Sequence, residues 1–169
     1  MSITIRYQQR GAALLTVLLL LLIMTLLGLA SLRSGLLEER MSGNLYDRSV
    51  SFQTAEAALR EAEVGIVART NLYDGSDGTF PLPVADATPR WLDAGTGWRN
   101  ATNLGGASTA VTARVIVEEM GVAPTWRGCD RVIPIDPSCM TGRFRITAVS
   151  QAPGRAQVML QSNYAMATP

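Results

Sequence analysis

Few side chains in this sequence could carry out covalent chemistry. The 169 residues include two cysteines, Cys129 and Cys139, and no histidine. Histidine is the commonest general base and metal ligand in proteins, and two cysteines alone are too few ligands for a metal site. The composition therefore argues against an enzyme and against a bound metal, and no cofactor is expected.

An acidic loop is the second place where chemistry is conceivable. The segment Asp74-Gly75-Ser76-Asp77-Gly78 offers several oxygen atoms on a tight turn, which is the ligand type that calcium prefers. The ligand spacing of an EF-hand is missing, including the distal Glu. A solvated turn is the favoured interpretation, and calcium binding by this loop is the alternative.

The third candidate is a peptide bond that another enzyme would cut. Gly11 follows the basic leader Met1 to Arg10 and precedes an apolar run from Ala12 to Leu32, in which eleven of 21 residues are Leu and none is charged. At ~1.5 Å per residue, a helix over this run spans the ~30 Å hydrocarbon core of a bilayer. Cleavage after Gly11 would remove the leader and leave Ala12 at the start of an intact membrane helix.

Charge in the leader predicts how this helix is oriented. The leader carries Arg6 and Arg10 and no acid, so the N-terminus stays in the cytoplasm and the rest of the chain is exported. In an exported domain, Cys129 and Cys139 most simply form a disulfide. Closing so short a loop stabilises the fold by roughly 2.5–3 kcal/mol in the chain-entropy model.

Helical periodicity continues beyond the apolar run. Apolar residues recur at spacings of three, four or seven and form one stripe: Leu37, Met41, Leu45, Phe52, Ala55, Leu59, Ala62 and Ile66. Such a stripe is typical of a helix that packs under a globular domain. Glu56 and Arg60 stand in the i,i+4 order that supports a helix. One helix is predicted from about Ala12 to about Arg69, with a transmembrane half over residues 12–32 and an amphipathic periplasmic half over residues 33–69.

The remaining residues, 70–169, are predicted to form a globular head. Residues 70–109 are rich in Gly, Pro and Asp, and form a loop layer that Phe80, Trp91 and Trp98 anchor. Residues 110–120, 143–150 and 157–164 alternate in polarity like half-buried strands. Pro153 and Gly154 suit the centre of a type II turn between the last two. The pattern predicts an α+β fold in which the helix stripe covers one face of an antiparallel sheet of three or four strands.

Two segments resemble a known family. Arg10-Gly11-Ala12-Ala13-Leu14-Leu15 resembles the processing site of a type IV prepilin. The residues from Leu37 to Arg48, followed by Phe52 to Arg60, closely resemble the N-terminal domain of PilX-type minor pilins. The resemblance covers roughly Arg10 to Glu63 and implies a type IV pilin-like fold, with one long N-terminal helix packed on a C-terminal sheet.

The resemblance also implies a function without an active site. Residues 1–11 would be a leader that prepilin peptidase removes between Gly11 and Ala12, with N-methylation of Ala12. The subunit would sit in the bacterial inner membrane with a periplasmic head, and would help to prime or cap a type IV pilus that serves twitching motility and cell adhesion. Implied partners are other minor pilins, the major pilin and the inner-membrane assembly platform, with a tip adhesin as a further candidate.

One position departs from the family pattern. Most pilins carry Glu at the fifth mature residue, where it resembles a counter-ion for the N-terminal amine of a neighbouring subunit. In this sequence the position is Thr16. A buried carboxylate is costly unless it is paired, so its absence fits a subunit at or near the tip, which has no earlier subunit to dock beneath.

Other functional classes remain open on the sequence. The same architecture serves a pseudopilin of a type II secretion system, and an unprocessed bitopic membrane protein with a periplasmic binding domain would share the apolar helix. A secretory signal peptide would be cut after Gly28-Leu29-Ala30, although the apolar run is too long for that class. The net charge of +1 argues against a nucleic-acid-binding protein.

Overall fold

The computed structural model describes residues 12–68, 73–104 and 111–167. The chain divides into two compact units, Met1–Asn44 and Leu45–Pro169. The predicted leader, with Gly11, lies outside the described residues. Within those ranges the α-helical structure is a single helix, α1 (Ala12–Val67), which agrees closely with the predicted helix.

In the first unit, α1 continues without interruption through Gly35 and Gly43. All side chains from Ala12 to Leu32 are exposed. An 18-residue window of the helix reaches a mean hydropathy of 2.8, so the helix is long and apolar enough to cross a membrane. So large an apolar surface needs lipid or other apolar side chains around it.

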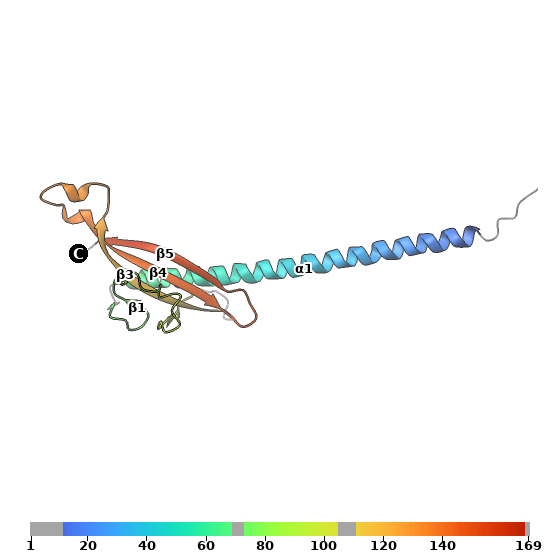
Figure 1. The fold of residues 1–169 in the computed structure, drawn as a ribbon, viewed down its shortest axis with the longest axis horizontal. Helices are drawn as coiled ribbons and strands as arrows, with labels where there is room; N and C mark the ends of the chain where they lie inside the picture. The colour runs from blue at the N-terminus through green and yellow to red at the C-terminus, as the bar shows by residue number, and fades with distance from the viewer. Residues whose placement is uncertain (1–11, 69–72, 105–110, 168–169) are drawn as a thin grey trace, which may run out of the picture. The chain divides into compact units, whose positions relative to one another are not determined.

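The second unit contains a mixed sheet. Its long strands are β3 (Thr112–Pro124), β4 (Met140–Gln151) and β5 (Val158–Ala167), which lie side by side as antiparallel neighbours (Figure 1). Two short strands, β1 (Thr79–Phe80) and β2 (Arg99–Asn100), pair with β3 on its other edge. The predicted antiparallel sheet is confirmed for the three long strands, whereas β1 adds a parallel pair that the polarity pattern did not reveal.

The turn between β4 and β5 has the predicted geometry. The backbone N–H of Arg155 donates to the carbonyl of Ala152 at 3.3 Å. Gly154 has a φ of +69°, which the third residue of a type II turn requires and which glycine adopts without strain.

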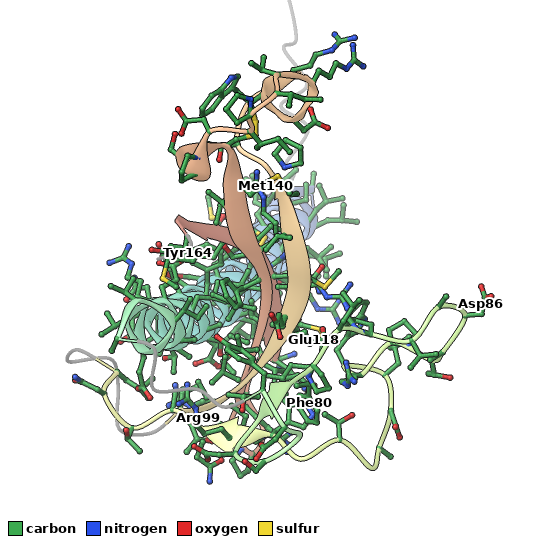
Figure 2. All side chains as sticks on the ribbon, turned by 90° about the vertical axis from the view of Figure 1, so that its left-hand side faces the viewer. Phe80, Asp86, Arg99, Glu118, Met140 and Tyr164 are labelled. Carbon is green, nitrogen blue, oxygen red and sulfur yellow. A yellow bond between two sulfur atoms is a disulfide. The ribbon has the colours of Figure 1, made fainter. Side chains whose placement is uncertain are left out.

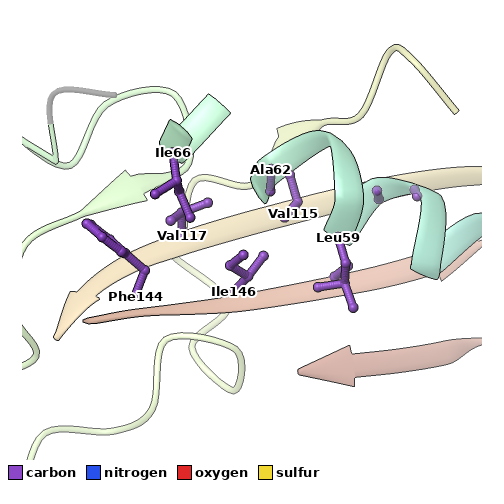
Figure 3. Packing of buried hydrophobic residues seen from close by; sticks show 10 residues of the cluster. Leu59, Ala62, Ile66, Val115, Val117, Phe144 and Ile146 are labelled. Carbon is purple, nitrogen blue, oxygen red and sulfur yellow. The ribbon is translucent and has the colours of Figure 1, made fainter. Parts of the chain in front are cut away.

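The main core lies between the end of α1 and one face of the sheet. Figure 3 shows Leu59, Ala62 and Ile66 of the helix over Val115, Val117 and Ile146 of the strands. Ala58 and Ala62 have no exposed surface. Their small side chains allow the helix backbone to approach the strands closely, so that both apolar surfaces are buried together.

The predicted apolar stripe is buried only in its second half. Ala55, Leu59, Ala62 and Ile66 are buried, as predicted. The prediction is wrong for the rest of the stripe, which is exposed: Leu37, Met41, Leu45 and Phe52. The carbonyl of Ala156 in the β4–β5 turn accepts a hydrogen bond from Ser51, which is the first buried residue of the helix. Leu45 lies before this contact, whereas Phe52 is an exposed position between the buried residues Ser51 and Thr54.

The loop layer covers the opposite face of the sheet. The alternation in β3 predicts a half-buried strand with Ile116 and Glu118 on the solvent side, but both side chains are fully buried. Figure 2 shows Glu118 on the side of the strands away from the helix, close to Phe80 at the start of the loop layer. The alternation shows which residues share a face, but it does not show that a non-periodic segment covers that face.

Candidate functional site

Two threonine hydroxyls in the apolar part of α1 are hydrogen-bonded within the helix. The hydroxyl of Thr16 donates to the carbonyl of Ala13 at 2.9 Å, and the hydroxyl of Thr25 donates to that of Leu22 at 2.8 Å. A polar group in hydrocarbon is costly unless it is hydrogen-bonded. With both donors occupied and no charge between Ala12 and Leu32, this half of the helix is suited to lipid or to apolar helix packing.

Residues 47–60 of the same helix join it to the head. The carboxylate of Asp47 pairs with Arg155 in the β4–β5 turn at 3.0 Å. Four residues later, the hydroxyl of Ser51 donates to the carbonyl of Ala156 at 2.6 Å. The predicted i,i+4 pair of Glu56 and Arg60 is also formed, at 2.7 Å. The helix is thus attached to the turn by polar contacts at the point where its buried face begins.

Around this junction, apolar side chains of the second unit face solvent. Leu45, Tyr46 and Phe52 are 61%, 68% and 46% exposed. These exposed apolar side chains lie on the part of α1 that belongs to the second unit. Exposed apolar side chains that recur along one helix commonly mark a contact with another protein.

A disulfide closes the loop between β3 and β4. Cys129 and Cys139 are joined, with Cα atoms 5.6 Å apart, and both are buried. The backbone N–H of Thr125 donates to the carbonyl of Cys139 at 2.7 Å. The bond and this contact close the base of the loop, which Figure 2 shows beyond Met140.

The loop presents apolar side chains outward. Trp126, Val132 and Ile135 are half or more exposed, and Ile133 is 90% exposed. Trp126, Val132 and Ile135 border a shallow groove of about 560 Å³, which is also lined by Pro134 and Pro137. The disulfide therefore holds an apolar surface in place, and such a surface is a candidate contact site for another protein.

The two short acidic turns are held by serine. In the predicted calcium loop, the hydroxyl and the backbone N–H of Ser76 both donate to Asp74, at 2.5 and 2.9 Å. These bonds hold the pKa of Asp74 below its ordinary value, the hydroxyl bond having the largest effect. The same arrangement of Ser138 and Asp136 lowers the pKa of Asp136. Among the described residues, no three His, Cys, Asp or Glu side chains gather as a metal site requires.

One charged cluster was not anticipated from the sequence. Glu118, which has no exposed surface, pairs with Arg90 at 3.0 Å and with Arg145 at 2.8 Å. The two guanidinium groups lie over the rings of Phe80 and Trp91, at 4.8 and 4.6 Å from the ring centroids. Glu118 and Arg145 are directly opposite each other on β3 and β4. The cluster fastens the loop layer to the sheet. The one feature of the sequence that could have revealed it is an acidic residue within an apolar strand.

Comparison with known proteins identifies the N-terminal third of the chain. Residues 10–60 match the family model described as PilX N-terminal. These residues are similar to the N-terminal domain of PilX-type pilins. No curated protein and no solved structure matches the chain.

The PilX N-terminal domain confirms the resemblance seen in the sequence. It supports, in general terms, a minor pilin related to type IV pili, which is a structural subunit that contacts other pilus components. The matched residues contain the exposed apolar segment and the exposed residues Leu45 and Phe52. They also contain the first buried residues of the head: Ser51, Thr54, Ala55, Ala58 and Leu59. The disulfide loop and most of the sheet lie beyond the matched residues.

Proposed function

We propose that this chain is a minor pilin that takes part in assembling a type IV pilus, in a priming or tip complex, and thereby in pilus-dependent motility and adhesion. The observation that supports the proposal is that α1 has two different parts within the residues that match the PilX N-terminal domain. Its first part exposes an uncharged apolar surface, and its last part is buried against the sheet. A helix of this kind can remain in a bilayer and later pack against other helices in a filament.

We propose four segments for the chain: a prepilin leader at residues 1–11, a transmembrane half-helix at 12–32, a periplasmic half-helix at 33–69 and a head at 70–169. Prepilin peptidase would cut between Gly11 and Ala12, and Ala12 would be N-methylated. The head would lie in the periplasm until the subunit enters the fibre. Other minor pilins, the major pilin and the inner-membrane assembly platform are the proposed partners.

The deciding experiment is the intact mass and N-terminal sequence of the membrane-extracted protein, made with and without a prepilin peptidase. Loss of residues 1–11 only when the peptidase is present, with a methyl group on Ala12, is the expected result. An uncut N-terminus in both strains would overturn the filament role and leave a membrane-anchored module. A start at Ser31 would instead indicate a secreted domain.

A deletion strain separates the pilus from the related secretion filament. Loss of twitching motility with normal protein secretion is expected. The opposite phenotype would assign the chain to the pseudopilins of a type II secretion system.

A position at or near the fibre tip is proposed from Thr16. The threonine side chain is uncharged, and its hydroxyl is bonded within its own helix. This position therefore offers no negative charge to the N-terminal amine of another subunit. We expect Thr16→Glu to lower incorporation into pili, because it places an unpaired carboxylate in an apolar environment. Unchanged pilus number and incorporation in this variant would show that residue 16 does not indicate where the subunit sits in the fibre. Thr25→Ser, which keeps a hydroxyl in the same segment, is the control.

A further inference from the structure

We infer that β5 is a docking edge, which accepts an extended, uncharged segment of a different protein as an additional strand of the sheet. β5 is the last strand in the order β1-β3-β4-β5, and within the described ranges no other strand pairs with it beyond β4. In an antiparallel pair, alternate residues direct their backbone N–H and C=O groups away from the partner strand. Among the described residues, the outer edge of β5 is therefore a row of backbone donors and acceptors that no other strand pairs.

This edge lacks the features that usually prevent strand pairing. Proteins protect sheet edges by short strands, prolines, bulges or charged side chains, lysine above all. β5 has ten residues, Val158–Ala167, and contains no proline, glycine or charged residue. Its register with β4 is continuous, whereas β3 and β4 shift register between Glu119 and Val122. The charges of the long strands lie on β3 and β4, away from the edge.

The side chains of β5 indicate what the added strand must look like. Leu160, Tyr164 and Met166 pack against the core and remain partly exposed. The alternate residues Gln161, Asn163 and Ala165 are exposed on the other face. A strand with apolar residues at every second position would cover the first set, and polar uncharged residues would match the second. Because β5 has no charge, a neutral strand can dock without desolvating an ion.

A second copy of this chain is a poor occupant of the edge. Among the described residues, the opposite edge of the sheet consists of β1 and β2, each two residues long, and of the end of β3 beyond Glu118, which contains a register shift and Pro124. It therefore offers no long regular strand for head-to-tail pairing. Pairing of two β5 strands in antiparallel fashion would relate the copies by a two-fold axis. In that pair the two copies of α1 in the heads would run in opposite directions, although both chains carry the apolar run at the N-terminal end of this helix. The partner is therefore a strand-forming segment of another protein.

Hydrogen exchange on the detergent-solubilised full chain tests whether the edge is free. Alternate amides of β5 should exchange quickly, while the amides of β4 stay protected. Uniform protection of β5 would show that the chain covers this edge itself, and would overturn the inference.

Photo-crosslinking in cells that make the protein tests what occupies the edge. A benzoylphenylalanine is placed at Gln161 in one strain and at Asn163 in another, both exposed positions. We expect both probes to crosslink to one peptide of another protein, with the attached residue displaced by two positions between the strains, as strand pairing requires. Crosslinks to β5 of a second copy, to unrelated peptides or to nothing would overturn the inference.

Two double lysine variants, one on β5 and one away from it, test whether the crosslink depends on strand pairing. Met159→Lys combined with Ala165→Lys should lower the yield of the crosslink from Gln161 about tenfold, because lysine discourages strand addition. Leu92→Lys combined with Val122→Lys places the same charges at exposed positions away from β5 and should leave the yield unchanged. An equal loss in both variants would contradict edge pairing. The result does not depend on leader processing, so the docking edge and the pilus role can fail separately.

Discussion

Glu118 links the loop layer to the sheet through one buried carboxylate. Both of its oxygens are paired, one with Arg90 and one with Arg145, and the side chain has no contact with solvent. Removal of one partner from a buried ionic cluster leaves the others desolvated and uncompensated. We expect Glu118→Ala to lower the free energy of unfolding by about 3–5 kcal/mol. Urea unfolding followed by tryptophan fluorescence measures this, because Trp91 lies on Arg145.

The matched control is Glu56→Ala, which breaks the exposed ion pair with Arg60. Such pairs contribute about 0.3–0.5 kcal/mol, so this variant should unfold almost like the wild type. A loss for Glu118→Ala no larger than that of the control would mean that the loop layer does not depend on the cluster.

Asp136 makes the stability of the disulfide loop depend on pH. The hydroxyl and N–H of Ser138 donate to one oxygen of Asp136 at 2.6 and 2.7 Å, and they lower its pKa. Because the folded pKa lies below the unfolded one, the contribution to stability is present above the unfolded pKa and is lost as pH falls through the folded pKa. We expect Ser138→Ala to raise the pKa of Asp136 in a carboxyl NMR titration. Asp74, held by Ser76 in its own turn, is the internal control and should not change.

At the scale of elements, the contact between helix and sheet depends on small residues. Ala62 is fully buried between α1 and the strands, so Ala62→Leu forces the two elements apart. Overpacking of this kind costs about 1–3 kcal/mol. A lower thermal unfolding midpoint of the head, measured by near-ultraviolet circular dichroism, is the expected result. Val64→Leu, at a position 68% exposed on the same helix, should be neutral, and equal effects of the two variants would contradict the packing argument.

At the scale of the whole molecule, the apolar half of α1 is the proposed membrane anchor. Leu21 is exposed in the middle of the uncharged segment. Arg near the bilayer centre disfavours insertion by about 3 kcal/mol relative to Leu. We expect Leu21→Arg to reduce the membrane-extractable fraction and to abolish piliation. Leu36→Arg, outside the apolar run, is the control for membrane insertion. Wild-type piliation of the Leu21→Arg strain would count strongly against the proposed role.

The local patterns of the sequence determined most of the secondary structure. The helix from Ala12, the three long strands and the turn at Pro153 and Gly154 all depend on residues close in the chain. Periodicity and turn preferences report such local structure directly. The PilX N-terminal domain was recognisable for the same reason, since its residues are contiguous.

Only the tertiary structure decided which of these surfaces are covered. The stripe residues Leu45 and Leu59 have the same character in sequence, yet only Leu59 has a sheet beneath it. Glu118 looked like a solvent-facing residue until the non-periodic loop layer brought Arg90 over it. The free edge of β5 likewise depends on strand order, which alternation does not encode. Whether a residue is buried depends on which segment packs against it, and in this protein that segment is distant in the chain.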